Sequence, residues 1–436
     1  MLSLSQEASS PWERFALGGL AAVTLTAYFY CSAVSSSWGL WVYLLCWAAV
    51  LAVRPSLILE HFQGWLIWLL PALCMLSTAW SRWQSLTFKQ ATEYIVFTLA
   101  VMTMAKVVGR RSTLLAVIAA LVVVVGISLA TGTGGRLFSS PGTIALRGIY
   151  ASKNFLVFNC AVLSVSALVG ALDKGFPLVA RLFCVGAICL GVIVGYMGHS
   201  LGGLVAMVVA MMFVLVTALG SRLAMSLRFS LVALLLATIT VIVVGFLVVP
   251  PDLLGEALRS VGKSSDLTGR TLLWAQAQLE MEQHPWLGIG FAAYWHPEFY
   301  DALGLYRALG IDAMTGFHFH NLFYESAVEL GYVGVLVMAI TLLSITGKGL
   351  ARFVINPSIS SSFTLGVMTL LLSRVYLEVD FLSPFSEGTF LVTLCYAFLK
   401  PDPVVLGSRA KLSFRNDDIT LQLRNPELQE GVATPR

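Results

Sequence analysis

The chain has 436 residues, of which 58% are hydrophobic and 11% are charged, and this balance excludes an ordinary soluble protein. The formal net charge of +4 is small and the basic residues are scattered, which excludes nucleic-acid binding as the main function. All seven cysteines fall in or beside apolar runs without metal-ligand spacing, so we expect them to be core residues rather than disulfide partners or metal ligands.

Apolar segments long enough to cross a bilayer recur along most of the chain, and each predicts a membrane helix. The first of these segments is long and lacks a small-residue cleavage site, so we expect it to stay as a membrane helix. The sequence therefore predicts an all-α, polytopic integral membrane protein of about twelve transmembrane helices. They are expected near residues 15–34, 38–53, 62–80, 88–107, 113–131, 154–172, 178–197, 201–219, 229–249, 320–346, 359–377 and 386–399.

The distribution of Lys and Arg between successive loops predicts the orientation of these helices. Most basic residues fall on the inner side if both termini are cytoplasmic, as expected for a protein of a bacterial inner membrane. The connection before the tenth helix then lies outside, and loops of about seventy residues are more often functional than decorative. We expect helices one to nine in 1–249, one large periplasmic loop in 250–319, helices ten to twelve in 320–400 and a cytoplasmic tail in 401–436.

Within this loop, Thr268 is a plausible N-cap for a helix that would run to Pro285. Arg270 then lies in the first turn, where free backbone N–H groups and a bidentate guanidinium favour an anion. The alternative is that Arg270 only caps surface structure or pairs with Asp266. The two glycines of Trp286–Gly290 predict a tight turn, which we interpret as structural.

His318 and His320 stand where the loop re-enters the membrane, directly before Asn321. A histidine at this boundary can exchange protons near neutral pH, which suits a general base acting on a sugar hydroxyl. An interfacial hydrogen bond is the alternative role. A His-x-His pair can also bind zinc, but no further cluster of matching spacing is evident, so we expect no metal.

Other ionisable residues fall at the outer ends of the predicted helices, where charges are costly unless they are paired or functional. Arg147 and Lys153 precede the sixth helix, and together with Arg270 they could surround a diphosphate. Arg374 and Glu378 would lie one helical turn apart and could instead satisfy each other.

Glu325 and Glu329 share one face of the predicted tenth helix, since they are four residues apart. Two interpretations are open for this pair. The carboxylates could orient His320, or they could face an aqueous vestibule.

Four passages together resemble the O-antigen ligase and polysaccharide polymerase superfamily, and most closely its exopolysaccharide-polymerase branch. They are Leu76–Ser81, Gly148–Asn154, Leu267–Thr271 with the following stretch to Gly290, and His320-Asn321 followed by Glu329–Gly334. The resemblance implies glycosyl transfer without a metal or cofactor at the periplasmic face. The donor would be a polyprenyl-diphosphate-linked saccharide, and the acceptor a hydroxyl group.

By position in these motifs, the resemblance implies that Arg270 engages the lipid diphosphate and that His320 activates the acceptor. Many relatives carry a second arginine near the outer start of the helix at 201–219, where this chain has Gly198-His199-Ser200-Leu201. His199, Arg147 or Lys153 would replace that phosphate ligand. The expected substrate-binding residues are Lys153, Arg147, His199, His318, Asn321 and Arg374.

These features predict a polymerase that joins lipid-linked oligosaccharide repeat units into exopolysaccharide or O-antigen. The alternative within the same chemistry is a ligase that moves a finished glycan onto lipid A core or protein. A transporter or flippase would also have about twelve spans, but transporters favour ionisable residues near the midplane, whereas here they gather at one face. The expected partners are the lipid-linked oligosaccharide and, as candidates, export or chain-length-control proteins, with no nucleic acid.

Overall fold

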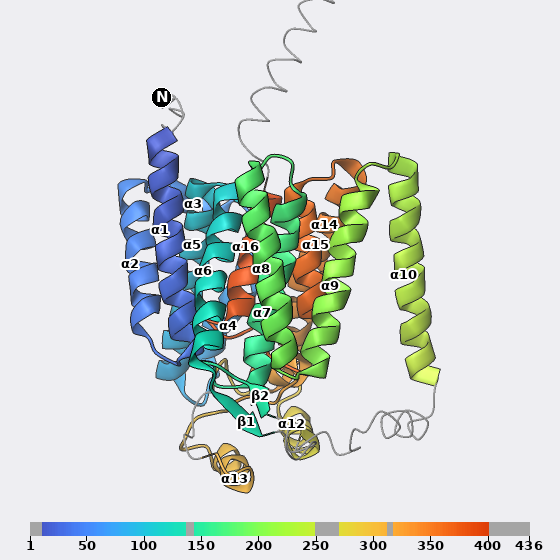
Figure 1. The fold of residues 1–436 in the computed structure, drawn as a ribbon. Helices are drawn as coiled ribbons and strands as arrows, with labels where there is room; N and C mark the ends of the chain where they lie inside the picture. The colour runs from blue at the N-terminus through green and yellow to red at the C-terminus, as the bar shows by residue number, and fades with distance from the viewer. Residues whose placement is uncertain (1–10, 137–143, 249–269, 312–316, 401–436) are drawn as a thin grey trace, which may run out of the picture. The chain divides into compact units, whose positions relative to one another are not determined.

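The structure, a computed structural model, describes residues 11–136, 144–248, 270–311 and 317–400. The described residues up to Phe398 form one compact unit, a bundle of long apolar helices (Figure 1). The predicted cytoplasmic tail at 401–436 and the predicted N-cap Thr268, with Asp266, lie outside the described residues.

The first half of the bundle is helical throughout. It contains α1 (Pro11–Ala33), α2 (Trp38–Val53), α3 (Ser56–Phe62), the 3₁₀ turns η1 (Trp65–Trp68) and η2 (Ser77–Ala79) on either side of α4 (Leu69–Leu76), α5 (Gln84–Val108) and α6 (Arg110–Thr131). A short antiparallel hairpin of β1 (Gly134–Arg136) and β2 (Ile144–Leu146) follows, with Gly134 opposite Leu146.

The second half continues with α7 (Lys153–Leu172), α8 (Leu178–Met197), α9 (Leu201–Gly220) and α10 (Met225–Val248). Two shorter helices, α12 (Arg270–Gln283) and α13 (Tyr300–Ala308), precede the long helix α14 (Leu322–Ile355). The chain then forms α15 (Ile359–Leu372) and α16 (Glu387–Leu399). Apart from the β1–β2 hairpin, the described elements are helices, which confirms the predicted all-α membrane fold.

Helix is present in each of the twelve segments predicted to cross the membrane, but length and composition support fewer spans. Seven described helices are long and apolar enough to span a bilayer, and the bent pair of α2 and α3 would make an eighth. Trp65–Ala79, Met225–Thr238, Ile359–Leu372 and Glu387–Leu399 are shorter apolar helices. The multi-spanning architecture is therefore confirmed, and the number twelve stays a prediction.

Helix α7 forms the centre of the bundle. Its most apolar stretch is 78% buried, against 28% for α8 and 33% for α9, whose outer faces are available to lipid. Polar groups within α7 bond along the helix, because the lipid core offers no water: Ser164 Oγ donates to the carbonyl of Cys160 at 2.8 Å, and Asn159 Nδ2 to that of Phe155 at 3.1 Å.

A break in α14 holds the segment that follows α12. At Gly331 the backbone adopts φ 66° and ψ −168°, and this interruption exposes backbone groups to a neighbouring chain segment. Gly290 N donates to the carbonyl of Glu329 at 2.9 Å, and Tyr332 N to that of Pro285 at 2.8 Å. These bonds fit the structural interpretation of the glycines in Trp286–Gly290.

The same segment is bonded on its other side to the turn that precedes α5. Phe291 N donates to Ser77 Oγ at 3.1 Å, Thr87 Oγ1 donates to the carbonyl of Phe291 at 2.7 Å, and Arg82 N donates to that of Ile289 at 3.2 Å. Three of the passages that carry the resemblance are therefore parts of one hydrogen-bonded unit: Leu76–Ser81, the stretch ending at Gly290, and Glu329–Gly334.

We expect Gly331→Ala to destabilise this unit strongly. A Cβ at this position would lie 2.1 Å from the carbonyl carbon of Trp286, and the left-handed φ alone costs a non-glycine residue about 1–2 kcal/mol. Thermal unfolding of the purified variant in detergent should show a clearly lower midpoint. Gly347→Ala, on the same helix with open space around the new Cβ, is the matched control. Equal midpoints for the two variants would contradict the role of the break.

Candidate functional site

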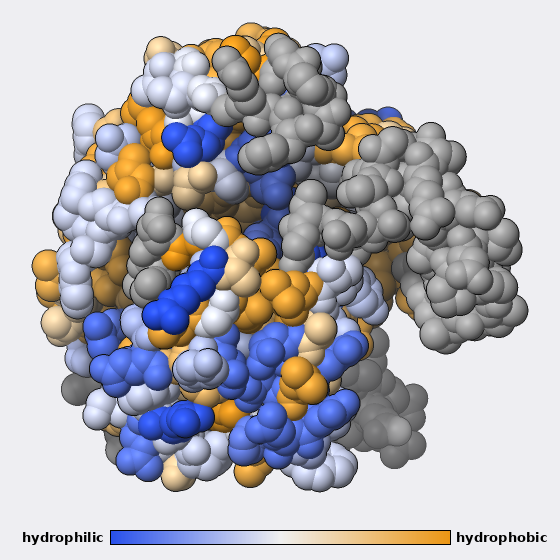
Figure 2. All heavy atoms as spheres, turned by 90° about the horizontal axis from the view of Figure 1, so that it is seen from below, coloured by the Kyte–Doolittle hydropathy of each residue, from blue (hydrophilic) through white to orange (hydrophobic). Residues whose placement is uncertain are grey.

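Helices α7, α9, α12 and α14 begin at the lower end of the bundle in Figure 1. Polar side chains from these helix starts are joined by hydrogen bonds. Figure 2 views the protein from this end and shows hydrophilic residues among hydrophobic ones. The connection between α15 and α16 reaches the same place and contributes Glu378, Arg374 and Asp380.

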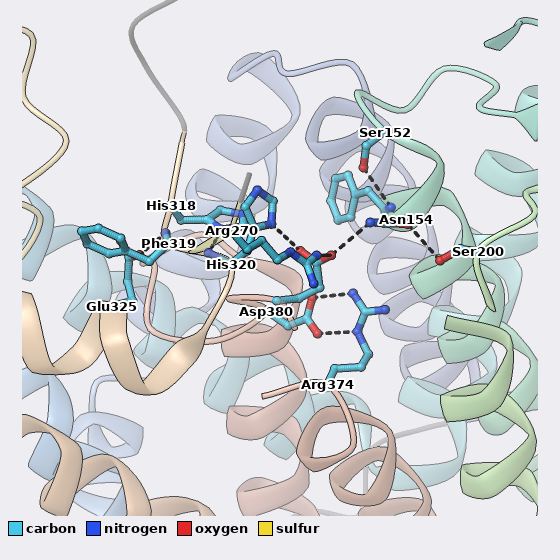
Figure 3. Close-up of polar contacts among 12 residues, drawn as sticks. Ser152, Asn154, Ser200, Arg270, His318, Phe319, His320, Glu325, Arg374 and Asp380 are labelled. Atoms are coloured by element: carbon cyan, nitrogen blue, oxygen red, sulfur yellow. Dashed lines mark hydrogen bonds and ion pairs between the residues drawn. The ribbon is translucent and has the colours of Figure 1, made fainter. Parts of the chain in front are cut away.

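The carboxylate of Glu378 joins these segments. Figure 3 shows Arg270, His320 and Asn154, which it connects, close to one another. The Oε1 atom of Glu378 accepts hydrogen bonds from Arg270 Nη2 at 3.2 Å and from Asn154 Nδ2 at 3.1 Å. Its Oε2 atom lies 3.2 Å from His320 Nδ1, and Ser200 Oγ donates to Asn154 Oδ1 at 2.9 Å. One carboxylate therefore connects Arg270 and His320, the two residues that the sequence singled out for catalysis.

The environment keeps Glu378 ionised. Burial by itself raises the pKa of this carboxyl, but the hydrogen bond and charge of His320, and then the charge of Arg374, outweigh it and lower the pKa to about 2. An ionised carboxylate only accepts hydrogen bonds, so His320 Nδ1 carries the proton of the shared bond. When the ring is neutral, its Nε2 atom then has a free lone pair.

His318 contacts both the backbone and the ring of His320. His318 Nδ1 accepts a hydrogen bond from the backbone N–H of His320 at 3.1 Å, and the two ring centroids are 4.2 Å apart. Desolvation, together with the neighbouring His320 and Arg270, lowers the pKa of His318 to about 3. His318 is therefore neutral at neutral pH and acts as an acceptor within the site.

His320 adopts a left-handed backbone with φ 52°, which is uncommon for a non-glycine residue. Residues on both sides hold it there. Phe319 N donates to Glu325 Oε2 at 2.8 Å, and Asn321 caps α14 by accepting from Phe323 N at 2.9 Å. Asn321, predicted to touch substrate, thus has a clear role in starting the helix.

Glu325 and Glu329 are each 5% exposed, so they do not line an open vestibule. Besides accepting from Phe319 N, Glu325 accepts from Trp295 Nε1 at 2.9 Å. Glu329 accepts from the backbone N–H of Ala292. Of the two interpretations left open by the sequence, the structure favours orientation of His320. Glu325 contributes to this orientation by accepting from the backbone N–H of the neighbouring Phe319.

Of the two roles considered for Arg374, the structure does not show the pairing with Glu378, and the predicted contact with substrate stays a prediction. Helix α15 ends at Leu372, so the two residues are not on successive turns of one helix. Arg374 instead forms a bidentate pair with Asp380, with Nε–Oδ2 2.6 Å and Nη2–Oδ1 3.0 Å, and its guanidinium lies over the ring of Phe158. The Arg374 side chain is 6% exposed, so this pair supports the connection that carries Glu378.

The remaining basic residues named from the sequence lie beside this network. Lys153 precedes Asn154 and its Nζ atom is 3.4 Å from the carbonyl oxygen of His199. His199 precedes Ser200, is exposed, and has a left-handed φ of 48°. Arg147 is exposed at the end of the β1–β2 hairpin, where its N–H donates to the Thr133 carbonyl. The structure therefore places Lys153 and His199 next to residues of the Glu378 network.

The structure adds a third group to the His-x-His pair. Ligand atoms of His318, His320 and Glu378 lie within 4.8 Å of one another, which corrects the expectation that no cluster accompanies the histidines. Sequence spacing could not find it because Glu378 is 58 residues beyond His320. An acidic residue in the last outer connection, close to Arg374, was the available signal.

Comparison with known proteins supports the resemblance. Residues 185–339 match the family model described as O-antigen ligase. The exopolysaccharide production protein ExoQ of Rhizobium meliloti (strain 1021) is 38% identical over 136 residues, which are 31% of this chain and 31% of that protein. The matched stretch thus spans about a third of the relative's length.

A solved structure described as "Structural coordination of polymerization and crosslinking by a peptidoglycan synthase complex" covers 77% of this chain and 96% of its own. Its TM-score is 0.35 and its identity 15%, too low to support an argument. Over residues 185–339 the chain is similar to the O-antigen ligase family, in agreement with the resemblance seen in the sequence, and its long apolar helices indicate a multi-pass membrane protein. The similarity to ExoQ over 136 residues agrees with the predicted resemblance to the exopolysaccharide branch.

We expect Asp380→Asn to destabilise the protein, because it leaves the buried Arg374 guanidinium without its counter-charge. Removing one partner of a buried pair costs about 3–5 kcal/mol, which should lower the thermal unfolding midpoint clearly. The control is Arg111→Met, which breaks the Arg111–Asp173 pair where the Arg111 side chain is 54% exposed, and which should cost under about 1 kcal/mol. A larger shift for the control would refute the supporting role of the Arg374–Asp380 pair.

Proposed function

We propose that this protein is a glycosyltransferase that joins polyprenyl-diphosphate-linked oligosaccharide repeat units into exopolysaccharide or O-antigen. The observation that carries the proposal is the Glu378 carboxylate, which holds Arg270 and His320 within one network. The reaction needs a positive group at the donor diphosphate and a base at the acceptor hydroxyl, and the two must lie close together. The site would face the periplasm, as the distribution of basic residues predicts.

On the acceptor side, His320 is the general base. Glu378 accepts a hydrogen bond from the protonated Nδ1 atom of His320. The free lone pair of Nε2 then takes the proton of the acceptor hydroxyl. The acceptor oxygen bonds to the anomeric carbon of the donor while the bond from that carbon to the diphosphate breaks. The diphosphate leaves with the electron pair, and the proton stays on His320 until it passes to solvent.

On the donor side, Arg270 stabilises the negative charge that grows on the leaving diphosphate. Fixed positive groups at that place stabilise the transition state more than the ground state, so no metal is required for this step. One oxygen of Glu378 accepts from the Arg270 guanidinium and orients it. The remaining N–H groups of Arg270 can then face the phosphate. Lys153, His199 and Arg147 are the proposed ligands of the second phosphate.

A ligase is the second candidate, and the family description "O-Antigen ligase" over residues 185–339 favours it. The donor chemistry would be the same, and only the acceptor would differ.

Deletion of the gene separates the two candidates. We expect a polymerase mutant to lose long polymer and to retain single repeat units, because the repeat units are still made but are not joined. Gel analysis of cell-surface and lipid-linked glycan measures this. Polymer of normal length that remains on its lipid carrier would instead identify a ligase.

Separate measurements of donor binding and transfer test the division of labour between His320 and Arg270. His320→Ala removes a base worth about 10²- to 10⁴-fold, so single-turnover transfer should slow by this factor while lipid-donor binding is kept. Arg270→Lys keeps the charge but loses the planar fork, and it should weaken both donor binding and transfer. The exposed His284→Ala in the same loop is the control and should behave as wild type. Transfer at the wild-type rate by His320→Ala would disprove the base.

A further inference from the structure

His318, His320 and Glu378 have the composition of a transition-metal site, although the proposed reaction needs no metal. Two imidazoles and a carboxylate are ligands that zinc accepts, and three protein ligands leave the fourth position open. Their ligand atoms already lie within 4.8 Å of one another. They come from two segments, the turn before α14 and the connection between α15 and α16.

We propose that these three residues bind a single divalent transition-metal ion such as Zn²⁺, and that the bound ion stops glycosyl transfer. The binding claim rests on the geometry alone. The inhibition rests on the proposed function, because it depends on His320 being the base.

The spacing of the ligands fits zinc with little rearrangement. Two ligands about 2.0–2.1 Å from a tetrahedral zinc ion are about 3.3 Å apart, and His320 Nδ1 lies 3.2 Å from Glu378 Oε2. An ion can therefore replace the proton between these two atoms. The ligand nitrogen of His318 lies within 4.8 Å of the other two ligand atoms, and a turn of the His318 ring would bring it to the ion.

The surroundings hold the ligands in place. Glu378 would use Oε2 for the ion and keep Oε1 for Arg270 and Asn154, so its orienting hydrogen bonds survive. Glu325 and Asn321 fix the backbone on both sides of His320. The nearby Arg270 guanidinium opposes a second positive charge, and this lowers the affinity below that of a dedicated structural zinc site.

The ion would stop transfer by changing which nitrogen of His320 carries the proton. With Glu378 at Nδ1, that atom is protonated and Nε2 can accept a proton. With a metal at Nδ1, a neutral imidazole carries its proton on Nε2 and has no lone pair there. His320 would then donate a hydrogen bond where the reaction needs a base.

Zinc binding to the full-length protein in detergent tests the site. The protein is first treated with a thiol-blocking reagent and a chelator, since seven cysteines could bind zinc independently. Zn²⁺ titrated against a chromogenic chelator should then bind with one ion per chain. His318→Ala and Glu378→Gln should each weaken this binding at least tenfold, while His284→Ala should not. Wild-type affinity in both site variants, each eluting as folded protein, would overturn the proposed site.

Single-turnover transfer with and without Zn²⁺ tests the inhibition. We expect the metal-free protein to be active and to lose transfer over the same range of free Zn²⁺ in which the ion binds, with recovery after chelation. Full activity of the zinc-loaded protein would overturn the inhibition and leave the proposed function intact. Activity that appears only after zinc is added would instead overturn the metal-independent mechanism.

Discussion

The ionised carboxylate of Glu378 is the interaction on which the functional end of the bundle depends. Arg270 and His320 come from segments that are separated in the chain, and both bring N–H groups that need an acceptor where water is largely excluded. Because Glu378 accepts from both, and from Asn154 as well, it provides that acceptor and fixes their directions. The buried Arg374–Asp380 pair belongs to the same short connection and stabilises it.

The second requirement is that His320 keeps an uncommon backbone conformation at the edge of the membrane. Helix α14 begins directly after it, capped by Asn321, and the helix is broken again at Gly331. The break accepts the segment around Gly288 and Gly290, which is also bonded to the turn before α5. Motifs that are far apart in the sequence therefore serve one purpose, namely to hold the loop rigidly against the helix that positions His320.

The fold was largely predictable because the membrane imposes one solution on long apolar segments: helices that satisfy their own backbone. The sequence also singled out Arg270 and His320, since each stands at a boundary where its chemistry is unusual. The structure brings them to one carboxylate, and their catalytic roles stay predictions. The partner of Arg374, Asp380, could not be identified because the end of α15 at Leu372 cannot be read from hydropathy. The role of Glu378 was missed because its partners lie 58 and 108 residues away, and the one signal, an acidic residue in an outer connection, does not say which residues it contacts.

Some residues of the Glu378 network lie inside the segment that matches the family model, and others lie outside it. Residues 185–339 include Arg270 and His320, the groups proposed to touch donor and acceptor, whereas Asn154 and Glu378 lie outside this range. The side chains of Arg270 and His320 are therefore oriented partly from outside the match, by Glu378, whereas Glu325 and Asn321, inside it, hold the backbone around His320. A hydrogen bond to an ionised carboxylate depends on atom positions within a few tenths of an ångström. Small shifts of α7 or of the connection after α15 can thus retune the base and the phosphate ligand while both side chains stay the same.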